Sequence, residues 1–113
     1  ANRLGNLIAI LDCNRIQKMD FVDKIMGNID WRDKWEAFGW VVDEVDGHNI
    51  EEFKKVIEKQ TDPDKPRLII GHTVKGKGVS IMENNPNWHF KLPGRRELKV
   101  FKEELDISDS ELE

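Results

Sequence analysis

The sequence has few features that would cross-link the chain or place it in a membrane. Cys13 is the only cysteine among 113 residues, so no internal disulfide can form. No stretch approaches the roughly 20 apolar residues that a membrane-spanning helix needs, and no signal-like apolar segment with a cleavage site is present. We therefore expect a cytoplasmic protein that does not bind membranes.

An excess of positive charge is also lacking. The 18 Lys and Arg residues are outnumbered by 22 Asp and Glu residues, which gives a net charge of −4, so we expect no nucleic-acid partner. Disorder is not expected either, because 38% of the residues are apolar, including four Trp and five Phe. The chain opens with Ala1 and not Met, shortly before a strand pattern. We predict that residues 1–113 form a single partial domain that begins mid-domain.

Three segments have the pattern of β-strands. Residues 7–11 form a continuous apolar run, which predicts a strand buried on both faces of a parallel sheet. Residues 40–45 predict a second strand, closed by a turn at Asp46 and Gly47, and residues 67–73 predict a third. Helical patterns lie between and after these strands. The alternation predicts an α/β fold, a two-layer or three-layer parallel β-sheet with flanking helices.

Three helices are predicted from apolar spacing and capping residues. Asp30 and Asn49 are suitable N-caps for the first two helices, and Gly39 is a suitable stop for the first. A third helix is expected after Gly94. The side chains expected on the apolar faces are Trp31, Trp35 and Phe38 in the first helix, Ile50, Phe53 and Ile57 in the second, and Leu98, Phe101 and Leu105 in the third. The acidic tail from Ser108 is expected to fray.

Ligands of open α/β sheets bind at the carboxyl ends of the strands. Residues 12–17, 46–49 and 72–80 are predicted to lie there. The side chain of Asn14 and a neighbouring backbone carbonyl are hard oxygen donors of the kind that Mg²⁺ or Ca²⁺ accepts. An asparagine after a strand is also a common turn or cap residue, so the pattern alone leaves both interpretations open.

A glycine-rich loop and three histidines are further candidates. Residues 72–80 carry two lysines between glycines, and they can bind phosphate or form a solvated loop. Of His48, His72 and His89, only His89 lies in a polar loop that suggests enough exposure for acid–base chemistry. The alternative is a packing histidine beside Trp88. Cys13 has no obvious activating partner and is predicted to be a small buried residue.

Several longer runs together resemble the transketolases. They are GNLIAILDCNRI at residues 5–16, KWEAFGW at 34–40, VDGH at 45–48, GHTVKGKGVSIMEN at 71–84 and WHFK at 88–91. The runs keep the order and the approximate spacing of the later part of the diphosphate-binding domain. The resemblance implies a partial thiamine-diphosphate-binding fold in a family that transfers ketol groups between sugar phosphates.

The resemblance also implies roles for particular residues. Asn14 matches an asparagine that binds Mg²⁺ and thereby the cofactor, Ile16 matches a residue that offers its backbone carbonyl to the metal, and His89 matches a catalytic histidine near cofactor and substrate. The cofactor, thiamine diphosphate, carries the difficult chemistry. In the family the site lies between two subunits, which implies a homo-oligomer or a complementary transketolase subunit.

The chain departs from the family pattern in two ways. The Gly-Asp-Gly half of the cofactor motif is absent, so we expect the isolated chain to be inactive alone. Phe90 and Lys91 follow His89 where many relatives have glycine. Three functions therefore stay open: part of a transketolase, a self-associating non-catalytic module derived from one, or part of a related enzyme such as deoxyxylulose phosphate synthase or dihydroxyacetone synthase.

Overall fold

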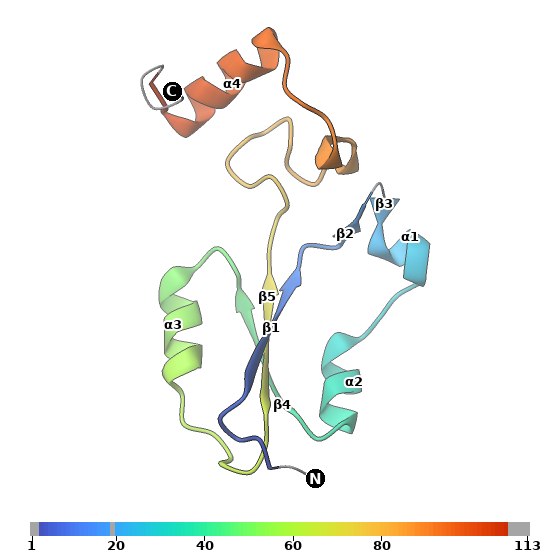
Figure 1. The fold of residues 1–113 in the computed structure, drawn as a ribbon, viewed down its shortest axis with the longest axis vertical. Coiled ribbons are helices and arrows are strands. Elements are labelled where there is room, and N and C mark those ends of the chain that lie inside the picture. The colour runs from blue at the N-terminus through green and yellow to red at the C-terminus, as the bar shows by residue number, and fades with distance from the viewer. Residues whose placement is uncertain (1–2, 19, 109–113) are drawn as a thin grey trace. The chain divides into compact units, whose positions relative to one another are not determined.

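The computed structural model describes residues 3–18 and 20–108, which form two compact units (Figure 1). The first unit is made of residues 1–14 and 26–73, and the second of residues 15–25 and 74–113. Each unit has more contacts within itself than with the other, which does not decide how many domains the chain forms. The single partial domain expected for residues 1–113 therefore stays a prediction. No helix in the described part of the chain is long and apolar enough to cross a membrane.

The first unit is built on a parallel sheet of three strands. These are β1 (Ile8–Cys13), β4 (Val41–Asp46) and β5 (Arg67–His72), in the order β1-β5-β4. Leu68 of β5 lies opposite Ala9 of β1 and Val42 of β4 in the register. All three predicted strands and the parallel α/β fold are confirmed.

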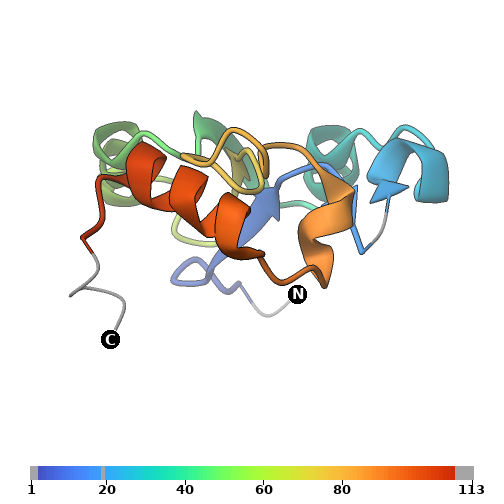
Figure 2. The ribbon, with the colours of Figure 1, turned by 90° about the horizontal axis from the view of Figure 1, so that it is seen from above.

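Helices cover both faces of this sheet, α2 (Trp31–Ala37) on one and α3 (Ile50–Glu58) on the other (Figures 1 and 2). Trp31 of α2 packs against a core that contains Leu68. On the opposite face, Arg67 donates hydrogen bonds to carbonyl groups at the end of α3. Arg67 and Leu68 reach different faces because successive side chains of a strand alternate. The first unit is therefore three layers thick.

The predicted helix ends are present. Asp30 Oδ1 accepts the Asp33 N–H at 3.0 Å, and Asn49 Oδ1 accepts the Glu52 N–H at 3.1 Å. Each bond satisfies a backbone donor that the first turn of a helix leaves without an intrahelical partner. Gly39 has φ of +85°, which suits a glycine just beyond a helix.

Three residues predicted on the apolar faces of α2 and α3 are exposed, and one of them, Ile57 near the end of α3, is 43% exposed. The side chain of Phe38 is 83% exposed because α2 ends at Ala37 and Phe38 leaves the helical phase as the C-cap. Ile50 is 79% exposed as the first residue of α3. The apolar pattern thus identified the helices but extended their buried faces too far at these ends.

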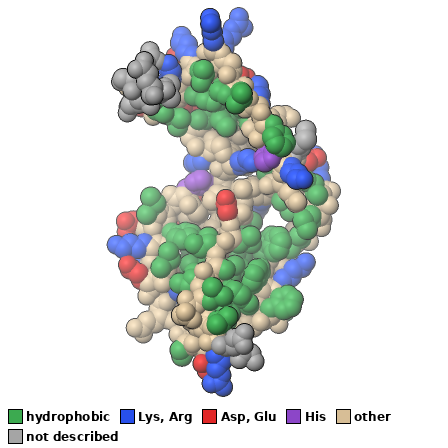
Figure 3. All heavy atoms as spheres, viewed as in Figure 1, with side chains coloured by type: hydrophobic (Ala, Val, Ile, Leu, Met, Phe, Trp, Pro, Cys, Tyr) green, Lys and Arg blue, Asp and Glu red, His purple; other side chains and the backbone are tan. Residues whose placement is uncertain are grey.

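The prediction that the first strand is buried on both faces is wrong for the described residues. Burial alternates along β1, and Ile10 is 58% exposed, whereas residues 67–71 of the central strand β5 are all buried. Apolar side chains accordingly gather on the surface over this part of the unit (Figure 3). Strand β1 lies at the edge of the sheet, and among the described residues no strand pairs with its outer side.

The second unit contains short elements and one longer helix. The strands β2 (Ile16–Gln17) and β3 (Asp20–Phe21) form an antiparallel pair, followed by α1 (Val22–Met26), and none of these was predicted. A 3-10 helix, η1 (Pro86–His89), occupies part of the predicted loop. The predicted last helix is confirmed as α4 (Arg95–Leu105), with Gly94 as its N-cap. Of the tail, residues 109–113 lie outside the described residues.

Candidate functional site

Asn14 and Ile16, the predicted metal ligands, flank a bend of the backbone at Arg15. Asn14 is half-buried directly after β1, and Ile16 is buried in β2. Arg15 between them has φ of +60°, a conformation that few residues other than glycine adopt, and its carbonyl accepts the Val22 N–H at 2.9 Å. Asn14 belongs to the first unit and Ile16 to the second.

The donor chemistry of these two residues fits Mg²⁺ but supplies only part of a coordination shell. An amide oxygen and a backbone carbonyl are hard oxygen donors, and Mg²⁺ takes about six oxygen ligands. Within residues 3–18 and 20–108, no group of three or more His, Cys, Asp or Glu side chains is arranged to hold a metal ion. The remaining ligands of such an ion would be the cofactor, water or groups from elsewhere.

The glycine-rich loop has a tightly determined backbone. Gly76 has φ of +80°, and a Cβ atom there would lie 2.7 Å from the Cβ of Met82. The carbonyl of Lys75 accepts the Asn84 N–H at 3.0 Å, and the carbonyl of Gly76 accepts the Val79 N–H at 3.1 Å. Glycine is therefore required at position 76, and the loop closes on itself around it.

His89 contacts a lysine of this loop. It is the last residue of η1, its ring is exposed, and its Nδ1 lies 3.2 Å from Lys75 Nζ. The ring of Phe90 meets the ring of His89 edge-on, with centroids 4.3 Å apart and an interplanar angle of 76°. The predicted catalytic histidine thus has one cationic and one aromatic neighbour.

Trp88 fixes the segment that carries His89. Its ring packs against Phe101 of α4 with centroids 5.6 Å apart, and Lys91 Nζ lies 4.3 Å from its centroid (Figure 2 shows η1 beside α4). Lys91 also forms an ion pair with Glu97, whose other carboxylate oxygen accepts the Gly94 N–H at 2.7 Å. These contacts, chiefly the bond from Lys91, lower the pKa of Glu97.

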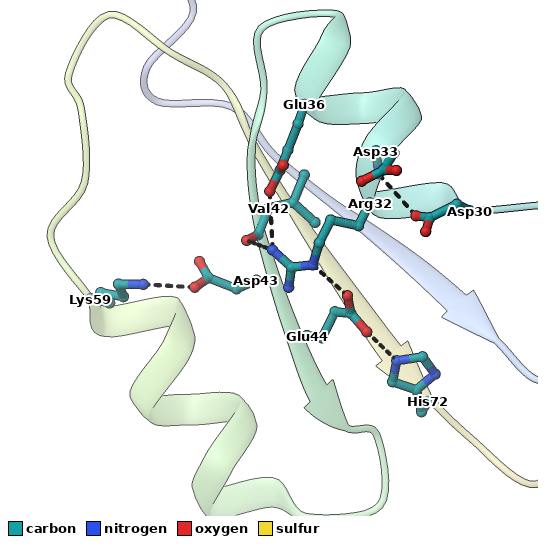
Figure 4. A network of polar contacts seen from close by, with 9 residues as sticks. All are labelled: Asp30, Arg32, Asp33, Glu36, Val42, Asp43, Glu44, Lys59 and His72. Atoms are coloured by element: carbon teal, nitrogen blue, oxygen red, sulfur yellow. Dashed lines mark hydrogen bonds and ion pairs between the residues drawn. The ribbon is translucent and has the colours of Figure 1, made fainter.

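A second polar cluster lies on the sheet of the first unit (Figure 4). One oxygen of the Glu44 carboxylate is 2.6 Å from Arg32 Nε and the other is 2.7 Å from His72 Nε2. The hydrogen bond from His72 is the main reason that the pKa of Glu44 is lowered, and Arg32 adds to it. Arg32 also donates to the Val42 carbonyl and to Glu36, both at 3.1 Å. The cluster joins α2 to β4 and β5.

Exposure does not distinguish His89 from the other histidines, contrary to the prediction. His48 and His72 are exposed as well. His89 differs in its neighbours, and sequence reasoning missed the most relevant one, Lys75. The two residues are 14 positions apart in the sequence and lie on different segments, so no local pattern links them. Cys13, predicted to be buried, is half-buried and packs at the edge of the core that contains Val42.

The chain is similar to transketolases along almost its whole length. The family described as transketolase, thiamine diphosphate binding domain, matches residues 1–112. An apulose-4-phosphate transketolase subunit of Phocaeicola vulgatus is 41% identical over 92 residues, which cover 80% of this chain and 33% of the relative. The 6-deoxy-6-sulfo-D-fructose transketolase subunit SqwG of a Clostridium species is 40% identical over 82 residues, which cover 72% of this chain and 30% of the relative.

Longer relatives and solved structures agree. Human transketolase is 36% identical over 103 residues, which cover 89% of this chain and 16% of that protein. The crystal structure of transketolase from Campylobacter jejuni superimposes with a TM-score of 0.65 at 24% identity, covering 97% of this chain and 23% of that one, so it supports the fold. The chain spans about a third of the length of the apulose-4-phosphate transketolase subunits that it matches.

Proposed function

Because this chain belongs to the transketolase family of thiamine-diphosphate-binding domains, we propose that it supplies part of the cofactor site of an enzyme that transfers a ketol group between sugar phosphates. The observation that carries the proposal is the family match over residues 1–112, which includes every predicted site residue. The predicted cofactors are thiamine diphosphate and Mg²⁺.

In this proposal Asn14 and Ile16 bind the metal. The side-chain oxygen of Asn14 and the backbone carbonyl of Ile16 are the two donors, and Mg²⁺ held there would neutralise the charge of the diphosphate. Their positions in the sequence support this role, because chain geometry keeps the Cα atoms of residues i and i+2 within about 7 Å of each other. The bound cofactor supplies the group that stabilises a carbanion during ketol transfer.

His89 is the proposed catalytic residue. An exposed imidazole can donate a hydrogen bond to a substrate oxygen, or exchange a proton with it, as negative charge develops there. The loop of Lys75 and the ring of Phe90 lie beside His89 within the same unit. Both residues are therefore close enough to affect how it meets a substrate.

The partner that we propose is a complementary transketolase subunit, with a second copy of this chain as the alternative. Three bacterial relatives are named as subunits of a transketolase: two apulose-4-phosphate transketolase subunits and the subunit SqwG. These relatives also show that the sugar varies, because the two bacterial proteins at 41% and 40% identity are named for different sugars. The substrate class we propose is therefore sugar phosphates in general.

Calorimetric titration tests the proposal. We expect thiamine diphosphate to bind in the presence of Mg²⁺ and to bind at least about tenfold more weakly without it. The Asn14→Ala variant should show a similar loss, while Asn6→Ala, an exposed asparagine before β1, should bind like the parent. Absence of binding at millimolar cofactor, a free energy weaker than about −4 kcal/mol, with and without a complementary transketolase subunit, would contradict the proposal.

The second candidate is a non-catalytic module that associates with itself. It is favoured by the outer edge of β1, where Ile8 and Ile10 are exposed and no described strand pairs with the backbone. Exposed edges of this kind favour association through strand pairing and apolar contact. Sedimentation analysis separates the candidates: a dimer that neither binds cofactor nor changes when a complementary transketolase subunit is added would favour the module.

A further inference from the structure

The contact between Lys75 and His89 favours one tautomer of the His89 ring. A lysine ammonium has three hydrogen-bond donors and no acceptor. Its Nζ lies 3.2 Å from Nδ1 of His89, so Nδ1 must act as the acceptor. In a neutral imidazole one nitrogen accepts and the other carries the proton, so a hydrogen bond accepted at Nδ1 places the proton on Nε2.

The backbone holds Lys75 where this contact forms. Its carbonyl accepts the Asn84 N–H at 3.0 Å, and the next residue, Gly76, lies against Met82 so closely that no Cβ atom fits. Lys75 itself is half-buried. The lysine side chain therefore leaves the loop from a backbone position that is fixed relative to Asn84 and Met82.

The neighbouring aromatic ring limits the other variable, the rotation of the imidazole. Phe90 meets His89 edge-on at 4.3 Å between centroids, an arrangement that aromatic rings prefer. A flip of the imidazole would exchange the positions of its nitrogen and carbon atoms and take Nδ1 away from Lys75. Phe90 thus restrains the plane of the imidazole, and the contact with Lys75 is what distinguishes the two flipped orientations.

We infer that Lys75 is a positioning residue that holds His89 as the Nε2–H tautomer, so that His89 meets the substrate as a hydrogen-bond donor. The role toward substrate rests on the proposed function, whereas the tautomer is a property of the chain itself. A donor at Nε2 stabilises negative charge on a substrate oxygen, and it cannot accept a proton at that atom. The inference thereby selects hydrogen-bond donation among the two actions open to His89.

Loss of activity in a Lys75 variant would not by itself establish this role. Lys75 lies in the loop for which phosphate binding is also predicted, so its removal can weaken cofactor binding directly. The decisive measurement must therefore report on the imidazole in the absence of cofactor. The ring nitrogen chemical shifts of histidine do so, because protonated and unprotonated nitrogens resonate far apart.

We would label the intact protein with ¹⁵N-histidine and record long-range nitrogen–proton correlation spectra at pH about 8, above the ordinary histidine pKa of about 6.5. The variants are Lys75→Met, which removes the donor at similar length, and Lys75→Arg, which restores a cationic donor. Lys77→Met is the matched control, because Lys77 is in the same loop and pairs with Glu83 at 3.8 Å. His48 and His72 serve as internal references.

In the parent protein we expect the proton of His89 on Nε2. Lys75→Met should lower the ratio of the Nε2–H to the Nδ1–H form by about fivefold, equivalent to about 1 kcal/mol. Lys75→Arg should recover most of the ratio, and Lys77→Met should leave it unchanged. Shifts of His48 and His72 that stay constant in every variant would show that the first unit is unaffected, and recovery of the parent ratio in Lys75→Arg would show that the second unit is intact.

Two results would overturn the inference: a parent protein with the proton on Nδ1, or a ratio that Lys75→Met and Lys77→Met change equally. If Lys75→Met also changes the shifts of His72, the test rests on Lys75→Arg alone. In that case a ratio of the Nε2–H to the Nδ1–H form that differs from the parent ratio in Lys75→Arg counts against the inference. These outcomes are independent of the calorimetric test, because the spectra require no cofactor. Normal cofactor binding with an unaltered tautomer would reject the positioning role and leave the proposed function standing.

Discussion

Replacing Arg67 with methionine should destabilise the first unit more than any comparable change at its surface. The side chain of Arg67 is 3% exposed and lies between the sheet and the end of α3. Its Nη2 donates to the Val56 carbonyl at 2.5 Å and to Asp43 Oδ2 at 3.2 Å, and its Nη1 donates to the carbonyls of Ile57 and Lys59, both at 3.2 Å. The last carbonyls of a helix have no intrahelical donor, so Arg67 satisfies groups that would otherwise be buried without one.

The expected loss in the free energy of unfolding follows from the burial of Arg67 and from the partners that its neighbours keep after the substitution. A hydrogen bond to a charged group contributes about 1.5–3 kcal/mol, and removal of one partner of a buried pair costs about 3–5 kcal/mol when the other charge is left alone. Asp43 is not left alone, because Lys59 Nζ lies 2.7 Å from its other oxygen. Methionine also keeps most of the apolar stem. We therefore expect Arg67→Met to lower the free energy of unfolding by about 3 kcal/mol.

Arg32→Met is the matched control. Arg32 also bonds to two carboxylates and a backbone carbonyl, but its side chain is 39% exposed. Exposed ion pairs contribute about 1 kcal/mol or less. Urea unfolding followed by tryptophan fluorescence measures both variants, since Trp31, Trp35 and Trp40 lie in the first unit. For a slope near about 1.5 kcal/mol/M, Arg67→Met should lower the midpoint by about 2 M. Equal losses in the two variants, or a loss below about 1 kcal/mol at Arg67, would refute the reasoning.

Two further predictions concern the loop and the response to acid. Gly76→Ala should destabilise the second unit by at least about 1 kcal/mol, because φ at this position is +80° and the new Cβ atom would meet Met82. Unfolding is followed by the fluorescence of Trp88, and a transition unchanged from that of the parent would contradict the prediction. The pKa of Asp43 is lowered: burial, the largest single cause, raises it, but the hydrogen bonds and charges of Lys59 and Arg67 together outweigh burial. Its carboxylate therefore stabilises the fold above the ordinary aspartate value of 3.8, and that contribution is lost as the pH falls below 3.8 through the folded-state pKa. The urea concentration at the unfolding midpoint should therefore decrease when the pH is lowered from about 5 to about 3. The decrease should be smaller in the Asp43→Asn variant.

Local features of the fold could be predicted from the sequence because their causes are local. Strand patterns, the caps Asp30 and Asn49, and the stop at Gly39 depend on residues within one or two turns. The strands β2 and β3, with two residues each, are too short to show a period. The exposed side of β1 could not be predicted either, because an apolar run does not indicate how many of its faces are covered.

Contacts across the sheet and between loops were beyond sequence reasoning. Glu44 and His72 are 28 residues apart and meet only because β4 pairs with β5, an order that alternation of strands and helices leaves open. Lys75 and His89 meet because a glycine-rich loop closes at Gly76 and η1 ends where it does. In both cases the residue types suggested chemistry, but only the fold identified the partner.

Asn14, a ligand of the proposed metal site, lies at the carboxyl end of β1, an edge strand of the described sheet. The carboxyl end of β1 is joined to that of β5, where the Thr73 hydroxyl donates to Asp12 and the Cys13 carbonyl accepts the Thr73 N–H at 3.4 Å. The other side of β1 is the outer edge of the described sheet. Mg²⁺ requires about six oxygen ligands, and Asn14 and Ile16 provide two. If they bind the metal, the remaining donors are other oxygen atoms, from the cofactor, water or further protein groups. The calorimetric experiment should therefore give tighter, Mg²⁺-dependent binding when a complementary subunit or a longer chain is present.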